Sequence, residues 1–73
     1  MKEKIKISVH EENILFIYSM GINYKDLINA LGMTKLQYVN CMINIKHKFN
    51  ETNLKKIIQQ AVSYNLINNY NNN

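Results

Sequence analysis

Apolar residues recur at helical spacing in three stretches of the chain. The clearest stripe places its members at i, i+3, i+4, i+7 and i+8: Leu54, Ile57, Ile58, Ala61 and Val62. An earlier helix has a broad apolar face within residues 14–20 and ends at Gly21, and a shorter one has its apolar face within 27–31 and ends at Gly32. The pattern predicts a compact all-α domain of four to five helices over residues 1–67.

The two ends of the chain follow other patterns. Lys2 to Val9 alternates charged and apolar residues, which predicts an edge strand, a flexible basic arm or an ordinary N-terminal extension packed on the first helix, over residues 1–8. Near the other end, Tyr64, Leu66 and Ile67 suggest a brief fifth element that completes the core or pairs with a second copy. Residues 68–73, NNYNNN, have too little apolar surface to fold and are expected to form a disordered tail.

Polar residues three positions apart mark where helices start: Ser8 with Glu11, Asn23 with Asp26, and Thr34 with Gln37. Asn50 or Thr52 is expected to cap the last helix. Gly32 stops one helix only two residues before Thr34 starts the next. Two helices joined by so short a turn cannot lie antiparallel, so they must cross at a wide angle and present one of them outward. This arrangement is a helix-turn-helix.

The run GINYKDLINALGMTKLQYVN, residues 21–40, resembles the helix-turn-helix of the phage repressor and Cro (XRE-like) family, whose usual form is G-[IL]-[ST]-x-x-[DE]-L-A-x-x-[LIV]-G-[VIM]-[ST]. The similarity continues through INIKHKFNETNLKKI and covers roughly residues 10–66. Two positions depart from the pattern: the bulky Ile28 replaces a small residue, and no loop glycine occurs near Asn44 or Ile45. The resemblance implies a lambda-repressor-like fold and places the helix after Thr34 in the major groove of DNA.

This recognition helix, expected at about residues 35–44, allows two registers. An ungapped match to the family buries Tyr38 and Cys41 and turns four residues to the groove: Lys35, Leu36, Val39 and Asn40. A match shifted by one residue instead buries Leu36, Val39, Met42 and Ile43. We favour the shifted register, because burying Leu36 and Val39 contributes about 1.5–3 kcal/mol each.

In the favoured register six residues are expected to read base edges: Lys35, Gln37, Tyr38, Asn40, Cys41 and Asn44. Asn and Gln can pair with N6 and N7 of adenine, and a Tyr ring or a Cys thiol can lie against a thymine methyl group. The chain contains no arginine, so a bidentate fork on guanine is absent. These residues predict an A·T-containing site on double-stranded DNA.

The DNA backbone is expected to contact the start of the helix after Asn23, the turn and the cationic loop after the recognition helix. The residues concerned are Asn23, Tyr24, Lys25, Thr34, Lys46 and Lys48. In the resembling family the start of this helix abuts the backbone, which supports Asn23, Tyr24 and Lys25. A net charge of +4, from nine lysines against five acidic residues, fits a polyanionic partner.

Other kinds of chemistry find little support in the sequence. Cys41 is the single cysteine, and His10 and His47 are far apart, so we expect no disulfide, metal site or cofactor. No acid/base pair or activated nucleophile can be assembled, so we expect no enzyme. No apolar run approaches about 20 residues and the N-terminus lacks a signal peptide, which predicts a cytoplasmic protein of a bacterial host cell with no membrane association.

The sequence thus predicts a sequence-specific, repressor or Cro-like transcription regulator of phage or mobile-element type. One domain reads about half a site, so a homodimer is expected, through residues 64–67 or the Ile5–Val9 strand. The alternative is a small phage-encoded inhibitor or antirepressor that keeps the helix-turn-helix fold and binds a protein partner. The absence of arginine, the modest charge and the apolar residues Tyr38, Cys41 and Met42 favour that alternative.

Overall fold

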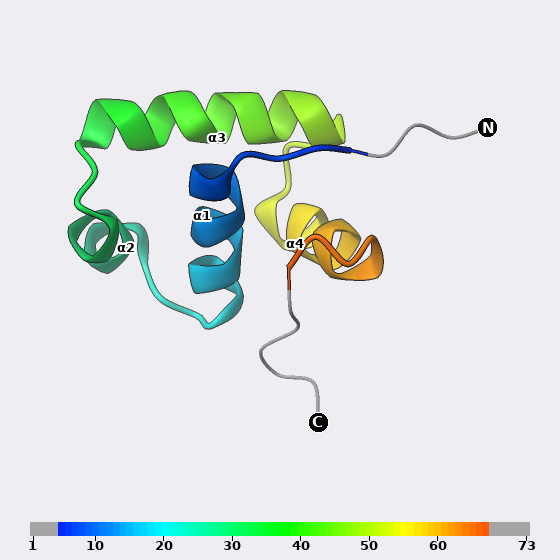
Figure 1. The fold of residues 1–73 in the computed structure, drawn as a ribbon, viewed down its shortest axis with the longest axis horizontal. Helices are drawn as coiled ribbons and strands as arrows, with labels where there is room; N and C mark the ends of the chain where they lie inside the picture. Colours follow the sequence, from blue (N-terminus) through cyan, green and yellow to red (C-terminus); the bar gives the residue numbers. More distant parts are fainter. Residues whose placement is uncertain (1–4, 68–73) are drawn as a thin grey trace.

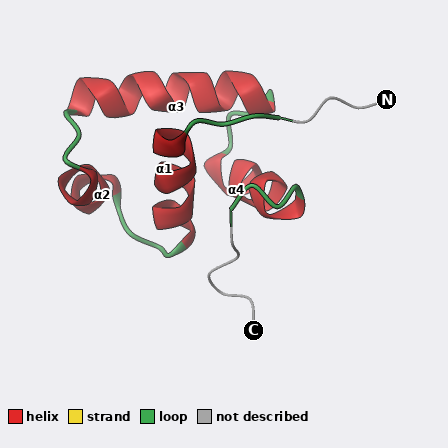
Figure 2. Ribbon diagram, viewed as in Figure 1, coloured by secondary structure: helices red, strands yellow, loops and turns green. Residues whose placement is uncertain are grey.

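Helices account for most of the described part of the chain, residues 5–67. In a computed structural model these residues form α1 (Val9–Ser19), α2 (Tyr24–Leu31), α3 (Lys35–Phe49) and α4 (Leu54–Ser63), and they contain no strand (Figure 2). The prediction of an all-α protein is confirmed, with four helices. The long helix α3 lies along one edge of the molecule, and α1, α2 and α4 all lie on the same side of α3 (Figure 1).

The predicted caps start the first three helices. The Ser8 hydroxyl accepts the Glu11 backbone N–H at 3.2 Å, while Glu11 Oε1 accepts the Ser8 backbone N–H at 2.8 Å, which completes a capping box. Asn23 Oδ1 accepts the Asp26 N–H at 3.0 Å at the start of α2. These bonds satisfy backbone donors that have no partner within the helix.

The cap of α4 differs from the prediction. Asn53, rather than Asn50 or Thr52, caps this helix, and its Oδ1 accepts the Lys56 N–H at 3.3 Å. Asn50 instead ends α3 in the left-handed conformation, with φ 51°. Asparagine tolerates this conformation better than most residues, which explains why α3 stops there.

Helix α3 is five residues longer than predicted, because it continues from Asn44 to Phe49. Ile45 and Phe49 are both buried, so the added turn extends the core-facing stripe. Lys46, His47 and Lys48 lie in the last turn, where positive charge interacts favourably with the helix dipole. The prediction of a cationic loop after the helix was therefore wrong.

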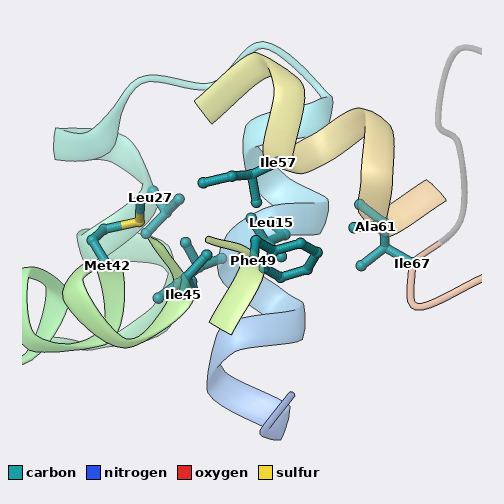
Figure 3. Close-up of a cluster of buried hydrophobic side chains, with 9 residues drawn as sticks. Leu15, Leu27, Met42, Ile45, Phe49, Ile57, Ala61 and Ile67 are labelled. Carbon is teal, nitrogen blue, oxygen red and sulfur yellow. The ribbon is translucent and has the colours of Figure 1, made fainter. Parts of the chain in front are cut away.

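The core is built from every helix and from one residue beyond α4 (Figure 3). Its members are Ile14, Leu15, Leu27, Met42, Ile45, Phe49, Ile57, Ala61 and Ile67. Helix α1 contacts each of the other three helices, and α3 also contacts α4. Ile67 reaches the core from a non-helical turn, so the predicted fifth element contributes to packing without forming a helix.

The N-terminal segment of the described residues packs against the core without forming a strand. Ile5 and Ile7 lie against it as half-buried residues, so of the three alternatives residues 5–8 adopt the packed extension. Residues 1–4 and the Asn-rich tail at 68–73 lie outside the described residues. Among the described helices, none combines the length and the apolar character needed to cross a membrane.

Candidate functional site

A three-residue turn joins α2 to α3. Gly32 adopts the left-handed conformation, φ 64° and ψ 30°, and the Met33 N–H donates to the Ile28 carbonyl at 2.9 Å, as in a Schellman-type helix end. Thr34 then caps α3 through the predicted capping box with Gln37. Figure 1 shows α2 end-on while α3 lies across the view, so the two helices cross rather than run antiparallel.

The register of α3 contradicts the favoured prediction. Leu36, Val39 and Ile43 were expected to be buried, but their exposed fractions are 69%, 39% and 59%. The side facing the core carries the buried residues Met42, Ile45 and Phe49, with Tyr38 and Cys41 half-buried beside them. A helix presents only one stripe to the core, and the stripe that ends at Phe49 is apolar from Tyr38 onward. The outer face is thus the one that the ungapped family match gives.

Four of the six predicted base-reading residues lie on the surface: Lys35, Gln37, Asn40 and Asn44. The other two, Tyr38 and Cys41, are half-buried and pack against the core. Their prediction as base-reading residues depended on the wrong register. The amide face that was expected to point outward from α3 is nevertheless exposed.

The exposed amides differ in what they are free to bind. Gln37 Oε1 accepts the Thr34 N–H at 2.9 Å, and the Thr34 hydroxyl accepts the Gln37 N–H at 3.1 Å. The cap uses one of the two lone pairs of the Gln37 oxygen and fixes the side chain at the start of α3, so its two N–H donors are the groups that stay fully available. Within residues 5–67 no hydrogen bond occupies the side chain of Asn40 or Asn44. These two amides keep both a donor and an acceptor available.

Three tyrosines form a cluster where α1, α2 and α3 meet. The Tyr38 ring stacks on Tyr24 with centroids 5.6 Å apart and lies 6.3 Å from the Tyr18 ring. The Tyr18 and Tyr38 hydroxyls share a hydrogen bond. Burial, and then this hydrogen bond, raise the pKa of Tyr18 well above its ordinary value. The three tyrosines therefore tie the start of α3 to α1 and α2.

The predicted backbone contacts fall into two groups. Asn23, Lys25, Thr34 and Lys46 are exposed, although the Asn23 and Thr34 oxygens already accept capping bonds. Tyr24 is half-buried in the tyrosine cluster. The Lys48 ammonium lies 2.7 Å from Glu11 Oε1, in an ion pair with a buried carboxylate. This pair competes with any phosphate contact by Lys48.

The charged side chains of α3 are all positive. The helix contains Lys35 in its first turn and Lys46 in its last, and its sequence has no acidic residue. By contrast, the carboxylate of Asp26 lies in the first turn of α2, close in sequence to Asn23 and Lys25. The outer face of α3 therefore suits an anionic partner better than the start of α2 does.

Three further residues lie on the outer face, although the favoured register predicts that they are buried: Leu36, Val39 and Ile43. Val39 and Ile43 border a shallow depression of about 310 Å³ that extends to Thr52 and Leu54. A second depression of about 370 Å³, bordered by Gln37 and Asn40, extends towards the α2–α3 turn. The ungapped family match, which turns Leu36 and Val39 outward, was the signal that could have identified this surface.

Cys41 is a free thiol that borders the second depression. Burial, and then the negative charge of Glu11, raise the pKa of the Cys41 thiol above its ordinary value. The reactive thiolate is therefore disfavoured at neutral pH. Residues 5–67 contain no group of three or more His, Cys, Asp or Glu side chains that could hold a metal ion.

Comparison of the chain with protein-family models, with curated proteins and with solved structures gives no match. The evidence for its function therefore comes from its own residues.

The two surfaces expected to form a dimer are largely used within the monomer. Ile5 and Ile7 pack against the core, Leu66 is half-buried and Ile67 is buried. Val9 and Tyr64 are the apolar residues of these segments that remain well exposed.

Proposed function

We propose that this chain is a repressor or Cro-like helix-turn-helix protein that binds duplex DNA, with α3 in the major groove. One observation carries the proposal: α3 presents the free amides of Asn40 and Asn44 on an outer face that has lysines near both ends and no acidic residue. An amide with both donor and acceptor available matches N6 and N7 of adenine. The flanking lysines match phosphates.

The dimensions of α3 support this geometry. Its 15 residues extend about 22 Å, and the major groove of B-DNA admits a single helix. The short turn at Gly32–Thr34 and the tyrosine cluster fix α3 across the end of α2, as a recognition helix requires. Regulation of phage or mobile-element genes, by one or two copies, is part of the same proposal.

The proposed contacts fall into three sets. Asn40 and Asn44 read adenine, and Lys35 and Lys46 bind phosphates on either side of the groove. Lys25 supplies a further phosphate contact at the start of α2, beside the carboxylate of Asp26. Lys48 is left out, because its ammonium is paired with Glu11.

A fluorescence anisotropy titration at two salt concentrations tests the proposal. The probes are a duplex enriched by this protein from a randomised pool and an unrelated duplex. Asn40→Ala should weaken binding to the enriched duplex by about 1–3 kcal/mol and leave the unrelated duplex almost unchanged. Lys46→Ala should weaken both alike and lower the salt slope by about one.

Asn13→Ala, which removes an exposed amide from α1, is the matched control and should leave both affinities unchanged. Absence of salt-sensitive binding to any duplex at low salt would refute the DNA-binding proposal.

The second candidate is a protein-binding inhibitor or antirepressor on the same scaffold. The exposed Leu36, Val39 and Ile43 favour it, because apolar residues at i, i+3 and i+7 form the kind of surface that partner helices bind. Fold alone does not distinguish the two, since one scaffold carries both functions. The titration above separates them, because a protein-binding domain would give no salt-sensitive duplex binding.

A further inference from the structure

Exposed aliphatic side chains occupy the centre of the outer face of α3. At 3.6 residues per turn, Leu36 and Ile43 lie only about 20° apart around the helix, with Asn40 directly beside them. This direction is opposite to that of Ile45 and Phe49, which point into the core. The proposed contacts through amides and lysines give no role to Leu36 and Ile43, the most exposed apolar residues of α3.

The charges around this stripe point to what covers it. Lys35 and Lys46 flank the stripe, and α3 carries no acidic residue. A second copy packed antiparallel through α3 would bring Lys35 against Lys46 of the other chain, and a parallel packing would bring each lysine against its own counterpart. Both arrangements oppose like charges. A polyanion with apolar groups on its surface fits the stripe better.

In the major groove the C5-methyl group of thymine is the apolar group that a protein can contact. We infer that Leu36 and Ile43, with Val39 beside them, bind thymine methyl groups, so that the target contains a short run of A·T pairs; this inference rests on the proposed DNA-binding function. Leu36 and Ile43 are about 10 Å apart along the helix axis, which corresponds to about three base-pair steps.

The amide of Asn40 and the aliphatic side chains beside it would then contact different groups of the same A·T pairs. Asn40 pairs with adenine N6 and N7, and the neighbouring aliphatic side chains contact the methyl groups of thymine. A G·C pair offers neither an adenine edge nor a methyl group. The stripe thus adds discrimination against G·C pairs, and the chain has no arginine to favour guanine.

Replacing thymidine by deoxyuridine tests the inference, because uracil lacks only the methyl group and keeps every hydrogen-bonding group. The probe is a duplex of about 20 base pairs, two helical turns, enriched by this protein from a randomised pool and then resynthesised with deoxyuridine. Each lost methyl contact should weaken binding about fourfold, and two should weaken it about 16-fold.

Protein variants show whether these side chains make the contact. In Leu36→Ala and Ile43→Ala the ratio of affinities for the thymidine and deoxyuridine duplexes should fall towards one, as a double-mutant cycle requires for groups that touch. Val9→Ala, which trims an exposed aliphatic residue of α1, should keep the ratio of the unmodified protein. Unfolding midpoints measured by circular dichroism should stay unchanged, because all three residues are exposed.

Two results would overturn the inference and leave the proposed function standing: equal binding of the thymidine and deoxyuridine duplexes, or a ratio that persists in both alanine variants of α3. Failure to bind any duplex would overturn the inference and the proposed function together. The stripe would then belong to a contact with a protein partner.

Discussion

At the scale of single residues, Glu11 combines two structural contacts. Its side chain is 5% exposed, and its Oε1 accepts both the Ser8 backbone N–H and the Lys48 ammonium. The same carboxylate thus caps α1 and holds the last turn of α3. A buried carboxylate left without its counter-ion destabilises the fold more than an ordinary lost contact, because desolvation of the charge remains uncompensated.

Replacement of Lys48 should therefore affect stability. We expect Lys48→Ala to lower the free energy of unfolding by about 1–3 kcal/mol, a figure that allows for the partial exposure of Lys48. Lys46→Ala, an exposed lysine two positions earlier in the same turn, is the control and should change stability by less than about 0.5 kcal/mol. Urea unfolding followed by circular dichroism measures both. Equal effects of the two substitutions would show that the ion pair contributes nothing.

At the scale of elements, α3 carries two aliphatic stripes on opposite sides. The inner stripe contains Met42, Ile45 and Phe49, and the outer stripe contains Leu36 and Ile43. Packing selects the inner stripe, because Ile45 lies beside Met42 and Leu27 and Phe49 lies beside Leu15 in the buried core (Figure 3). The outer stripe stays available for a ligand.

Two isoleucines two positions apart test this assignment. Ile45→Ala should destabilise the fold by about 2–5 kcal/mol, because Ile45 is fully buried, whereas Ile43→Ala should change stability by less than about 0.5 kcal/mol. If Ile45→Ala does not fold, Ile45→Val should still cost about 0.5–1.5 kcal/mol, against almost nothing for Ile43→Val. Thermal and urea unfolding report both pairs. A larger loss of stability for Ile43→Ala than for Ile45→Ala would instead support the shifted register, in which Ile43 is buried.

The sequence predicted where α1, α2 and α3 start, because a capping interaction involves residues only three positions apart. The pairs Ser8 with Glu11 and Thr34 with Gln37 form bonds three residues apart, and Gly32 needs only its own backbone freedom. The start of α4 was less certain, since Asn50, Thr52 and Asn53 can all cap a helix. In the structure Asn53 is the cap, and its backbone N–H donates to Glu51 Oε2 at 3.0 Å.

The register of α3 could not be predicted in the same way. For a helix that ends near Asn44, the favoured register predicts an apolar face of four residues: Leu36, Val39, Met42 and Ile43. Extension to Phe49 adds two buried residues to the competing stripe and reverses the balance. Asn40 and Asn44 are exposed in either register, whereas Tyr38 and Cys41 turn outward only in the shifted one and are half-buried in the structure.

At the scale of the whole molecule, the tyrosine cluster joins three helices. Tyr18 belongs to α1, Tyr24 to α2 and Tyr38 to α3, and the outer two rings both lie against Tyr38. The neutral form of Tyr18 is favoured by burial and by its bond to Tyr38, which raise its pKa. A raised pKa in the folded state contributes stability that is fully present below the unfolded pKa, about 10, and is lost as pH rises above it.

Tyr18→Phe should reveal this dependence. Near neutral pH the variant should be about 1 kcal/mol less stable, because the Tyr38 hydroxyl loses its partner. As pH rises above about 10 the difference from the unmodified protein should narrow, since the variant has no phenol to ionise at this position. Urea unfolding at a series of alkaline pH values measures the trend. A constant difference between Tyr18→Phe and the unmodified protein across this series would contradict the expectation.

Ile67 extends the buried core beyond the last helix. It lies beyond the last turn of α4, yet it is as well buried as the helical core residues and packs beside Ala61 (Figure 3). A truncated chain that stops at Ser63 would keep all four helices and still leave an apolar gap over α4. Expression boundaries and fusion points for this domain therefore belong after residue 67, not at the end of its final helix.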